Sequence, residues 1–387
     1  MKKIAILGST GSIGETTLKI IKKDKKNFVV NLLTTNKNVN KIYKQAKEFK
    51  VKNIIISDLI AYRKAQNRFK KSKINFYNNY DNLNKVLKTK NDLVMSSITG
   101  LNGLLPTLKS IKHTKKILIA NKESIICGWN LINKELKRNK TNFVPVDSEH
   151  FSIWSLLQNH NSNDIDKIFI TASGGPFLKY KLSKLKDVTP KEAIKHPNWN
   201  MGKKISVDSA TMMNKVFELI EAQRIFGFDR SKFKILIHPQ SLVHAIIKFN
   251  NGLTKILVHD TNMKIPIFNS IYQDKLKKIK TKNININLLN NLKLTKINSK
   301  KYPSTKILNK INNTNSLFET VLISSNDELV ELYIKNKIKF LQINKILLKI
   351  LNTKKYSNLI MKKPKKISDI INLSKEVRLK TRKLCIK

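Results

Sequence analysis

The sequence is poor in cysteine and in long apolar runs. Only Cys127 and Cys385 occur in 387 residues, and they lie far apart. A disulfide framework is therefore excluded, no cysteine metal site is indicated, and a reducing, cytoplasmic location is expected. No run of about 18 uncharged apolar residues is present, which argues against a membrane-spanning helix. The apolar segment Ile4–Leu7 begins close to the first residue, so no targeting segment is expected.

Acidic residues are also scarce, with 26 Asp and Glu against 76 Lys and Arg and a formal net charge of +50. One interpretation is a nucleic-acid-binding protein. The other is a compositional bias towards Lys, Asn and Ile, as an AT-rich genome produces. We favour the bias, because the lysines are spread along the whole chain and no nucleic-acid motif accompanies them. No specific nucleic-acid partner is expected, although the positive field attracts anionic substrates.

The length predicts two or three domains. Residues 1–147 alternate short apolar strands with amphipathic helices, which predicts a Rossmann-like, doubly wound parallel sheet in an α/β protein. The expected strands are Ile4–Leu7, Phe28–Leu33, Asn53–Ile56, Leu93–Met95, Lys116–Ile119 and Phe143–Val146. Helices are expected between them, including Glu15–Ile21 and Leu104–Ile111.

The rest of the chain divides into three further regions. Residues 148–272 predict an α+β domain that carries most of the polar motifs. Its expected elements are strands at Ile165–Thr171, Lys234–His238 and Lys255–Val258 and one long helix at Val207–Arg224. Residues 273–300 are rich in Lys and Asn and indicate a linker. Residues 301–387 contain no glycine and show helical spacing of apolar residues, which predicts a helical C-terminal domain.

A glycine loop, Gly8-Ser-Thr-Gly-Ser-Ile-Gly14, follows the first strand and opens a helix. In a dinucleotide site the first glycine permits a tight turn. The second lets the backbone approach a pyrophosphate, and the third allows the helix to pack closely on the strand. The alternative is a structural turn. The position at the first strand–helix junction favours nucleotide binding.

The end of the second strand indicates which dinucleotide binds. NAD sites usually place an acid there for the ribose hydroxyl. Here the chain reads Thr34-Thr-Asn-Lys-Asn38, with a lysine and no acid. This pattern favours NADP, whose 2′-phosphate Lys37 and the asparagine amides would bind.

Asp147 and Glu149 follow the last expected strand of the first domain, in the run Pro145-Val-Asp-Ser-Glu-His150. If the backbone stays extended, side chains two apart point to the same side, so both carboxylates would reach one Mg²⁺ or Mn²⁺ ion. The alternative is a helix-capping acid with a solvated neighbour. Glu218 is a candidate third ligand, but spacing alone does not bring it to the other two.

Several other polar groups have the pattern of a ligand site. Lys122, with Asn121, ends a strand and could contact substrate or cofactor, or simply start a helix. The turn Thr171–Phe177 offers an anion nest with Ser173, or a plain turn. Ser209, Asn214 and Lys215 could complete a phosphate site. The run from His196 to Gly202 suits a lid over a ligand, with a buried structural Trp199 as the alternative.

Together these motifs resemble the 1-deoxy-D-xylulose 5-phosphate reductoisomerase family. The resemblance covers about the first 270 residues and becomes loose in the C-terminal third. The matching blocks are GSTGSIG at 8–14, ANKES at 120–124, PVDSEH at 145–150, SGGPF at 173–177, HPNWNMGKKISVDSATMMNK at 196–215 and HPQSLVH at 238–244. The chain departs from the family pattern at Asn36, where glycine is common, and at Val216-Phe217.

The resemblance implies a homodimeric oxidoreductase that uses NADPH and a divalent ion, Mg²⁺ or Mn²⁺ with Co²⁺ as a further option. Its substrate would be a small phosphorylated ketose. The implied NADPH contacts are Thr10, Gly11, Ser12, Ile13, Asn36, Lys37, Asn38, Asn121, Glu123 and Gly202. The implied metal ligands are Asp147, Glu149 and Glu218. The implied substrate contacts are Lys122, Ser148, Glu149, Ser173, His196, Ser209, Asn214, Lys215 and Glu218, with Lys122 and Glu149 catalytic.

Two rival functions are weighed against this one. The first is another NADP-dependent dehydrogenase of a phosphorylated substrate, without isomerase activity. The second is a basic nucleic-acid-binding protein in which the glycine loop is structural. Product analysis separates the first rival, since only a reductoisomerase changes the carbon skeleton.

Overall fold

The structure is a computed structural model that describes residues 1–199, 201–273, 277–283 and 285–385. The chain forms two compact units. The first unit comprises residues 1–124, 131–151 and 263–279, and the second comprises residues 125–130, 152–262 and 280–387. Each unit is described by itself.

The first unit is built on a seven-stranded parallel sheet with the order β4-β3-β2-β1-β5-β6-β7. The expected strands are confirmed. One short strand, β4, was not expected, because its three residues are too few to show a pattern. The strands are β1 (Lys2–Leu7), β2 (Phe28–Thr35), β3 (Asn53–Ile56), β4 (Asn75–Tyr77), β5 (Asn91–Ser96), β6 (Thr114–Ile119) and β7 (Asn142–Pro145).

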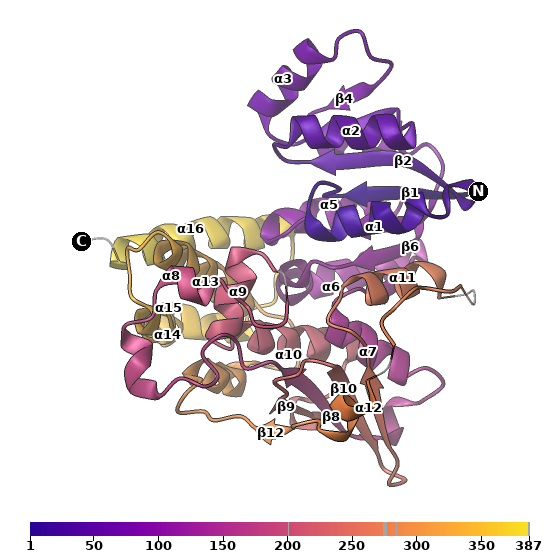
Figure 1. The fold of residues 1–387 in the computed structure, drawn as a ribbon. Helices are drawn as coiled ribbons and strands as arrows, with labels where there is room; N and C mark the ends of the chain where they lie inside the picture. The colour runs from indigo at the N-terminus through magenta and orange to yellow at the C-terminus, as the bar shows by residue number, and fades with distance from the viewer. Residues whose placement is uncertain (200, 274–276, 284, 386–387) are drawn as a thin grey trace. The chain divides into compact units, whose positions relative to one another are not determined.

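Helices accompany these strands, as expected for a doubly wound sheet (Figure 1). They are α1 (Ser12–Lys22), α2 (Val39–Phe49), α3 (Leu59–Arg68), α4 (Leu83–Val86), α5 (Leu104–Ile111), α6 (Lys122–Asn139), α7 (Ser148–Leu156) and α11 (Lys264–Tyr272). The inner strands are apolar because both faces are covered, and Ile4–Leu7 of β1 are fully buried. Since all strands are parallel, the loops after β1, β2, β6 and β7 lie at one edge of the sheet.

The second unit contains a five-stranded sheet with the order β11-β10-β8-β9-β12. Strands β8 and β9 are parallel and the other pairs are antiparallel. The strands are β8 (Ile165–Ala172), β9 (Phe233–Ile237), β10 (Val243–Phe249), β11 (Thr254–Val258) and β12 (Thr295–Lys296). The expected strands are confirmed, whereas β10 and β12 were not expected. The segment 273–300 therefore contributes a strand to this sheet, along with helix α12 (Ile286–Asn290).

The long helix expected at Val207–Arg224 is wrong, because two helices occur there. Helix α9 spans Lys203–Ala210 and α10 spans Met213–Phe226. Between them Met212 adopts the left-handed conformation, with φ of 66°. A methionine gives no warning of such a break, since this conformation is usual only for glycine and asparagine.

The remaining helices of the second unit come mainly from the C-terminal region, as expected. They are α8 (Pro190–Ala193), α13 (Phe318–Ile334), α14 (Phe340–Leu351), α15 (Lys354–Ser357) and α16 (Ile367–Cys385). Helix α13 is buried along most of its length and packs against α14 and α16 (Figure 1). Within the described ranges, no helix combines the length and the apolar character needed to cross a bilayer. Short 3₁₀ helices occur at Lys25–Asn27, Tyr80–Asn82, Leu101–Gly103, Ser162–Asp164, Leu182–Lys186, Arg230–Lys232, Pro303–Lys310 and Asn358–Met361.

We predict that Gly14→Ala destabilises the first unit. An alanine Cβ at this position would lie 2.4 Å from the carbonyl oxygen of Gly8 and 2.5 Å from Cα of Ser9. Because both neighbours are backbone, the helix must shift, at a cost of about 1–3 kcal/mol. Urea denaturation measures the loss. Gly11→Ala is the control, since its Cβ would meet only the Gly8 carbonyl at 3.5 Å. Equal stability of the two variants would contradict the prediction.

Candidate functional site

The glycine loop after β1 has the shape that phosphate binding needs. Gly8 has φ of +82°, and a Cβ there would lie 2.9 Å from the carbonyl oxygen of Ser97. Gly11 is the N-cap of α1 and gives no side-chain hydrogen bond to the first helical turn. The N–H of Gly11 donates to the Gly8 carbonyl at 3.2 Å, and the N–H of Glu15 begins the helical bonds to Gly11, so an anion would be bound by the N–H groups of the first helical turn between them. The residues present therefore fit a dinucleotide.

The turn after β2 contains the predicted lysine and also an acid. Asn36 donates a hydrogen bond from Nδ2 to Oγ of Ser57, at 2.9 Å, and its φ is not positive, so glycine is not required there. Asn38 caps α2 by accepting from the N–H of Lys41. Lys37 is largely exposed, and its Nζ lies 3.6 Å from Oδ2 of Asp58. Sequence reasoning missed Asp58, because it reaches Lys37 from the neighbouring β3–α3 turn.

Lys122 and Asp147 form a half-buried ion pair, with Nζ 3.1 Å from Oδ2. The other oxygen of Asp147 lies 3.0 Å from Nδ1 of the fully buried His150. Lys122 begins α6 after β6, and Asp147 follows β7, so the neighbouring parallel strands bring them together. Both oxygens of the Asp147 carboxylate therefore have a polar neighbour.

The expectation of extended backbone from Asp147 to Glu149 is wrong. Helix α7 begins at Ser148, and the N–H of Glu149 donates to Oδ1 of Asp147 at 3.2 Å. Asp147 therefore has the capping role weighed as the alternative, and its role as a metal ligand stays a prediction. Ser148 donates its hydroxyl hydrogen bond to the Glu149 carboxylate. These acceptor groups lie together at the edge of the sheet.

Asn121 is the N-cap of α6 and is almost fully buried. Its side chain accepts from the N–H of Ser124 at 2.7 Å and donates to the carbonyl oxygens of Ile98 and Gly100. The helix-start interpretation of this residue is therefore confirmed. Glu123 lies in the first turn of the same helix. Cofactor contacts of these two residues stay a prediction.

In the second unit, Ser173 and His196 meet across 23 residues of sequence. Oγ of Ser173 lies 2.9 Å from Nε2 of His196. Nδ1 of His196 accepts from the N–H groups of Asn198 and Trp199, at 3.2 and 3.0 Å, so the proton of the neutral ring sits on Nε2. This nitrogen is thus a neutral hydrogen-bond donor towards Ser173 or a bound anion.

The Gly174–Gly175 turn brings Ser173 next to the end of α9. Both glycines have positive φ, and a Cβ at Gly175 would lie 2.7 Å from the carbonyl oxygen of Ser209. The N–H of Gly175 donates to Oγ of Ser173 at 3.1 Å, so this N–H is already used within the turn. The predicted anion nest therefore cannot use this N–H group to bind an anion while the hydrogen bond is formed.

The start of α10 holds a buried charged cluster. Lys215 and Glu218 form an ion pair one turn apart, and Asn214 donates from Nδ2 to the same carboxylate. Lys215 and Glu218 are 4% and 2% exposed, so these polar contacts offset the cost of removing both groups from water. All three predicted residues are brought together within the second unit. Asp147 and Glu149 belong to the first unit, so a site with all three carboxylates stays a prediction.

The proposed lid is anchored at its start. Asn198 donates from Nδ2 to the Pro239 carbonyl and to Oγ of Ser241, and Trp199 is half-buried with its ring against His244. Asn200 lies outside the described residues. Gly202 is the N-cap of α9. Trp199 is thus neither fully exposed nor fully buried, and its role in a lid stays a prediction.

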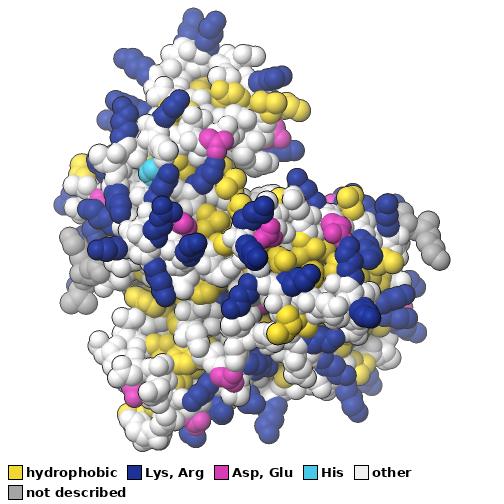
Figure 2. All heavy atoms as spheres, turned by 180° about the vertical axis from the view of Figure 1, so that it is seen from behind, with side chains coloured by type: hydrophobic (Ala, Val, Ile, Leu, Met, Phe, Trp, Pro, Cys, Tyr) yellow, Lys and Arg dark blue, Asp and Glu magenta, His cyan; other side chains and the backbone are white. Residues whose placement is uncertain are grey.

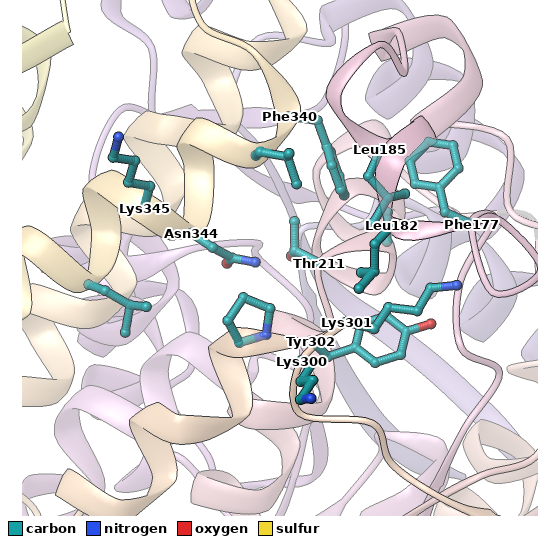
Figure 3. Close-up of a pocket in the computed structure, with 14 residues that line it drawn as sticks. Phe177, Leu182, Leu185, Thr211, Lys300, Lys301, Tyr302, Phe340, Asn344 and Lys345 are labelled. Atoms are coloured by element: carbon teal, nitrogen blue, oxygen red, sulfur yellow. The ribbon is translucent and has the colours of Figure 1, made fainter.

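A cavity of about 260 Å³ lies elsewhere in the second unit (Figure 3). Phe177, Leu185 and Phe340 make its wall largely apolar, and Thr211 joins them shortly after Ser209. None of the predicted cofactor, metal or substrate residues lines it. The cavity is therefore separate from the residues predicted to bind the substrate.

The basic side chains form no single patch on the face that Figure 2 shows. Lys and Arg are scattered over it, with Asp and Glu between them (Figure 2). This distribution agrees with a compositional bias and gives no support to a nucleic-acid interface on that face.

We predict that His196 stays neutral in the folded protein from pH 8 down to about pH 5. Burial, reinforced by the charge of Lys215, lowers the pKa of His196 to about 4. Between pH 6.5 and 4 the unfolded chain binds a proton that the folded chain does not, so stability falls as the pH falls. NMR titration of the imidazole measures the pKa, and His196→Gln removes this part of the pH dependence of unfolding. Titration near pH 6.5 would contradict the prediction.

Three family models match most of the chain. The model described as 1-deoxy-D-xylulose 5-phosphate reductoisomerase matches residues 4–128. The model for the C-terminal domain of the same enzyme matches residues 143–226. The model described as the DXP reductoisomerase C-terminal domain matches residues 259–380, the region where the motifs alone were weak.

Individual relatives lead to the same family as these models. The 1-deoxy-D-xylulose 5-phosphate reductoisomerase of Pelagibacter ubique is 58% identical over 98% of both chains, and that of Clostridium novyi is 37% identical over 98% of both. Among solved structures, the Zymomonas mobilis enzyme in complex with NADPH has 30% identity and a TM-score of 0.90, over 100% of this chain and 99% of that one. A reductoisomerase in complex with NADPH, fosmidomycin and magnesium has 29% identity and a TM-score of 0.91, over 99% and 98%. The chain therefore belongs to the 1-deoxy-D-xylulose 5-phosphate reductoisomerase family.

Proposed function

We propose that this protein converts 1-deoxy-D-xylulose 5-phosphate to 2-C-methyl-D-erythritol 4-phosphate with NADPH and a divalent metal, in the non-mevalonate isoprenoid pathway. The observation that carries the proposal is the 58% identity to a reductoisomerase over 98% of both chains. The rival dehydrogenase without isomerase activity has no comparable support. Solved relatives bind NADPH and magnesium, which supports the same ligands for this chain.

Bound NADPH supplies the hydride, and the chain's part is to bind and orient it. The open N-terminus of α1 supports a pyrophosphate site at the glycine loop. Lys37 and the neighbouring amides would hold the 2′-phosphate. The proposed contacts are Thr10, Gly11, Ser12, Ile13, Asn36, Lys37, Asn38, Asn121, Glu123 and Gly202.

We propose Asp147, Glu149 and Glu218 as ligands of one divalent ion. A donor set of carboxylates fits Mg²⁺, which prefers oxygen ligands and keeps waters, and Mn²⁺ or Co²⁺ are further candidates. The bound ion supplies Lewis acidity at the carbonyl of the substrate. The ammonium group of Lys215 and the amide of Asn214 both contact the Glu218 carboxylate and hold it in place.

Ser173, His196, Ser209, Asn214 and Lys215 are proposed to bind the substrate phosphate. The neutral His196 would donate from Nε2, and Lys215 would supply the positive charge. Such a mix of neutral and charged donors binds a phosphate without a net excess of buried positive charge.

Lys122, Ser148, Glu149 and Glu218 are proposed to contact the sugar part of the substrate. Lys122 is held by Asp147 and would donate a hydrogen bond to a substrate oxygen. The Glu149 carboxylate, which accepts from Ser148, would take the proton of a substrate hydroxyl and return it to the rearranged product.

We propose a cytoplasmic homodimer. Strand β11 is an edge strand of the five-stranded sheet, and its side chains Ile256 and Val258 are 48% and 40% exposed. Exposed apolar residues on an unpaired edge are typical of a surface that another chain covers. We also propose the division into residues 1–147 for cofactor binding, 148–272 for catalysis, 273–300 as a connection and 301–387 as a helical domain.

The function is tested by following NADPH oxidation with 1-deoxy-D-xylulose 5-phosphate in the presence of Mg²⁺ or Mn²⁺. Carbon NMR of the product then shows whether the skeleton is branched. A branched alcohol supports a reductoisomerase. An unbranched reduced product would favour the rival dehydrogenase, and NADPH oxidation without metal would contradict the metal requirement.

We predict that the charges of Lys37 and Asp58 act in opposite directions on cofactor choice. Lys37→Glu should weaken NADPH binding far more than NADH binding. Asp58→Asn should tighten NADPH binding by about two- to fivefold, the size of an exposed charge contact, and leave NADH unchanged. Asparagine still caps α3, where Asp58 accepts from the N–H of Ala61. Fluorescence titrations with both cofactors measure this, and equal changes for both would remove these residues from the 2′-phosphate site.

We predict that Glu218→Gln raises the metal concentration for half-maximal activity by about tenfold or more, because the variant keeps the shape and loses the charge. Titration of activity with Mg²⁺ and Mn²⁺ measures the shift. Glu331→Gln is the control, since Glu331 is an exposed residue paired with Lys335. A wild-type metal dependence of Glu218→Gln would require a different set of ligands.

A further inference from the structure

A buried polar cluster joins helix α9 to the C-terminal helices. The carboxylate of Asp208 lies 2.9 Å from Nζ of Lys204 and accepts from Nδ2 of Asn326 at 2.7 Å. Lys204 also lies 3.0 Å from Oδ1 of Asp327, and Asp327 accepts from Nη2 of Arg378 at 2.5 Å. The cluster thus connects α9, α13 and α16, and the sequence analysis gave neither Lys204 nor Asp208 a role.

The cluster is costly to bury. Asp208 and Asn326 are 1% and 0% exposed. Burial raises the pKa of Asp208 above its ordinary range, although Lys204 and Asn326 oppose that shift. Apolar side chains of the same size would give comparable stability without this desolvation penalty. The polar partners instead make the packing specific, because hydrogen bonds and ion pairs fix which residues of two helices face each other.

Helix α9 depends on such contacts for its orientation. It has eight residues, which is too short to be stable alone. The ammonium group of Lys204 also lies 5.1 Å above the ring of Phe217 on α10. Lys204 and Asp208 are four residues apart, so the first and last turns of α9 are both held by this cluster.

The held end of α9 carries a proposed phosphate contact. Asp208 directly precedes Ser209, whose carbonyl oxygen packs against Gly175 of the Ser173 turn. Ser209 therefore lies in the last turn of the anchored helix, and its backbone packs against the glycine turn. Three residues after Ser209 the chain reaches the left-handed Met212, and α10 then begins and carries Asn214 and Lys215.

We infer that Asp208 is a positioning residue for the substrate phosphate: by binding Lys204 and Asn326 it sets the orientation of α9 and so the place of Ser209. The C-terminal helices take part in substrate binding through this contact, without touching the substrate. The inference rests on the proposed function, since it concerns the phosphate site named there.

The test compares four proteins. Asp208→Asn keeps the shape and removes the charge. Asp208→Asn combined with Lys204→Met removes both charges, so no unpaired charge remains. Ser374→Ala is the matched control, because it breaks a buried 2.8 Å hydrogen bond between Ser324 on α13 and Ser374 on α16 without touching α9. The wild type completes the set.

For both Asp208 variants we expect the KM for 1-deoxy-D-xylulose 5-phosphate to rise about tenfold or more, with kcat within about threefold. NADPH affinity should stay unchanged. Inorganic phosphate should raise the Tm of each protein. The phosphate concentration that gives half of the maximal increase should rise by the same factor as KM. The double variant should regain the wild-type Tm and keep the high KM, which a merely stabilising role would not do.

A lowered Tm with unchanged KM and unchanged phosphate protection in Asp208→Asn would overturn the inference. So would a rise in KM in Ser374→Ala equal to that in Asp208→Asn, or the absence of any phosphate protection in the wild type. If the wild type does not reduce the ketose phosphate, the proposed function fails. The phosphate measurements on the four proteins then still decide the role of Asp208.

Discussion

The structure depends on how each unit pairs its buried and half-buried carboxylates with basic side chains. Asp147 is compensated by Lys122, Glu218 by Lys215, and Asp208 by a lysine one turn earlier. A buried carboxylate without such a partner would take up a proton or destabilise the fold. Each pairing therefore fixes a helix start or a helix face, and the positions of the polar groups follow from it.

The two sheets place these pairs in different ways. In the first unit all strands are parallel, so the loops that follow them gather at one edge, and neighbouring strands β6 and β7 bring Lys122 to Asp147. In the second unit the polar residues lie on helices α9 and α10 and on the glycine turn after β8. The break at Met212 matters there, because in one continuous helix the relative positions of Ser209 and Lys215 would be set by helical geometry alone.

The sequence predicted most of the fold where periodicity is strong. Six of the seven strands of the parallel sheet were found because each is an apolar run bounded by turns, and the C-terminal helices because apolar residues recur at helical spacing. Several of the errors arose where a short segment decided the outcome. Helix α7 begins directly at Ser148, so the argument from extended backbone did not apply to Glu149. Strand β12 has only two residues and no pattern of its own.

The parallel sheet, the order of the motifs and the chemical groups available for a cofactor, a metal and a phosphate could all be predicted from the residues alone. Which charged groups meet could not, because that depends on how the chain packs. Asp58 reaches Lys37 from another turn, and Asn326 binds Asp208 across 118 residues of sequence. Packing also decided that His196 is neutral, because burial and the charge of Lys215 lower its pKa. Periodicity reports which face of an element is buried, whereas ion pairing and desolvation depend on neighbours that packing brings from distant parts of the chain.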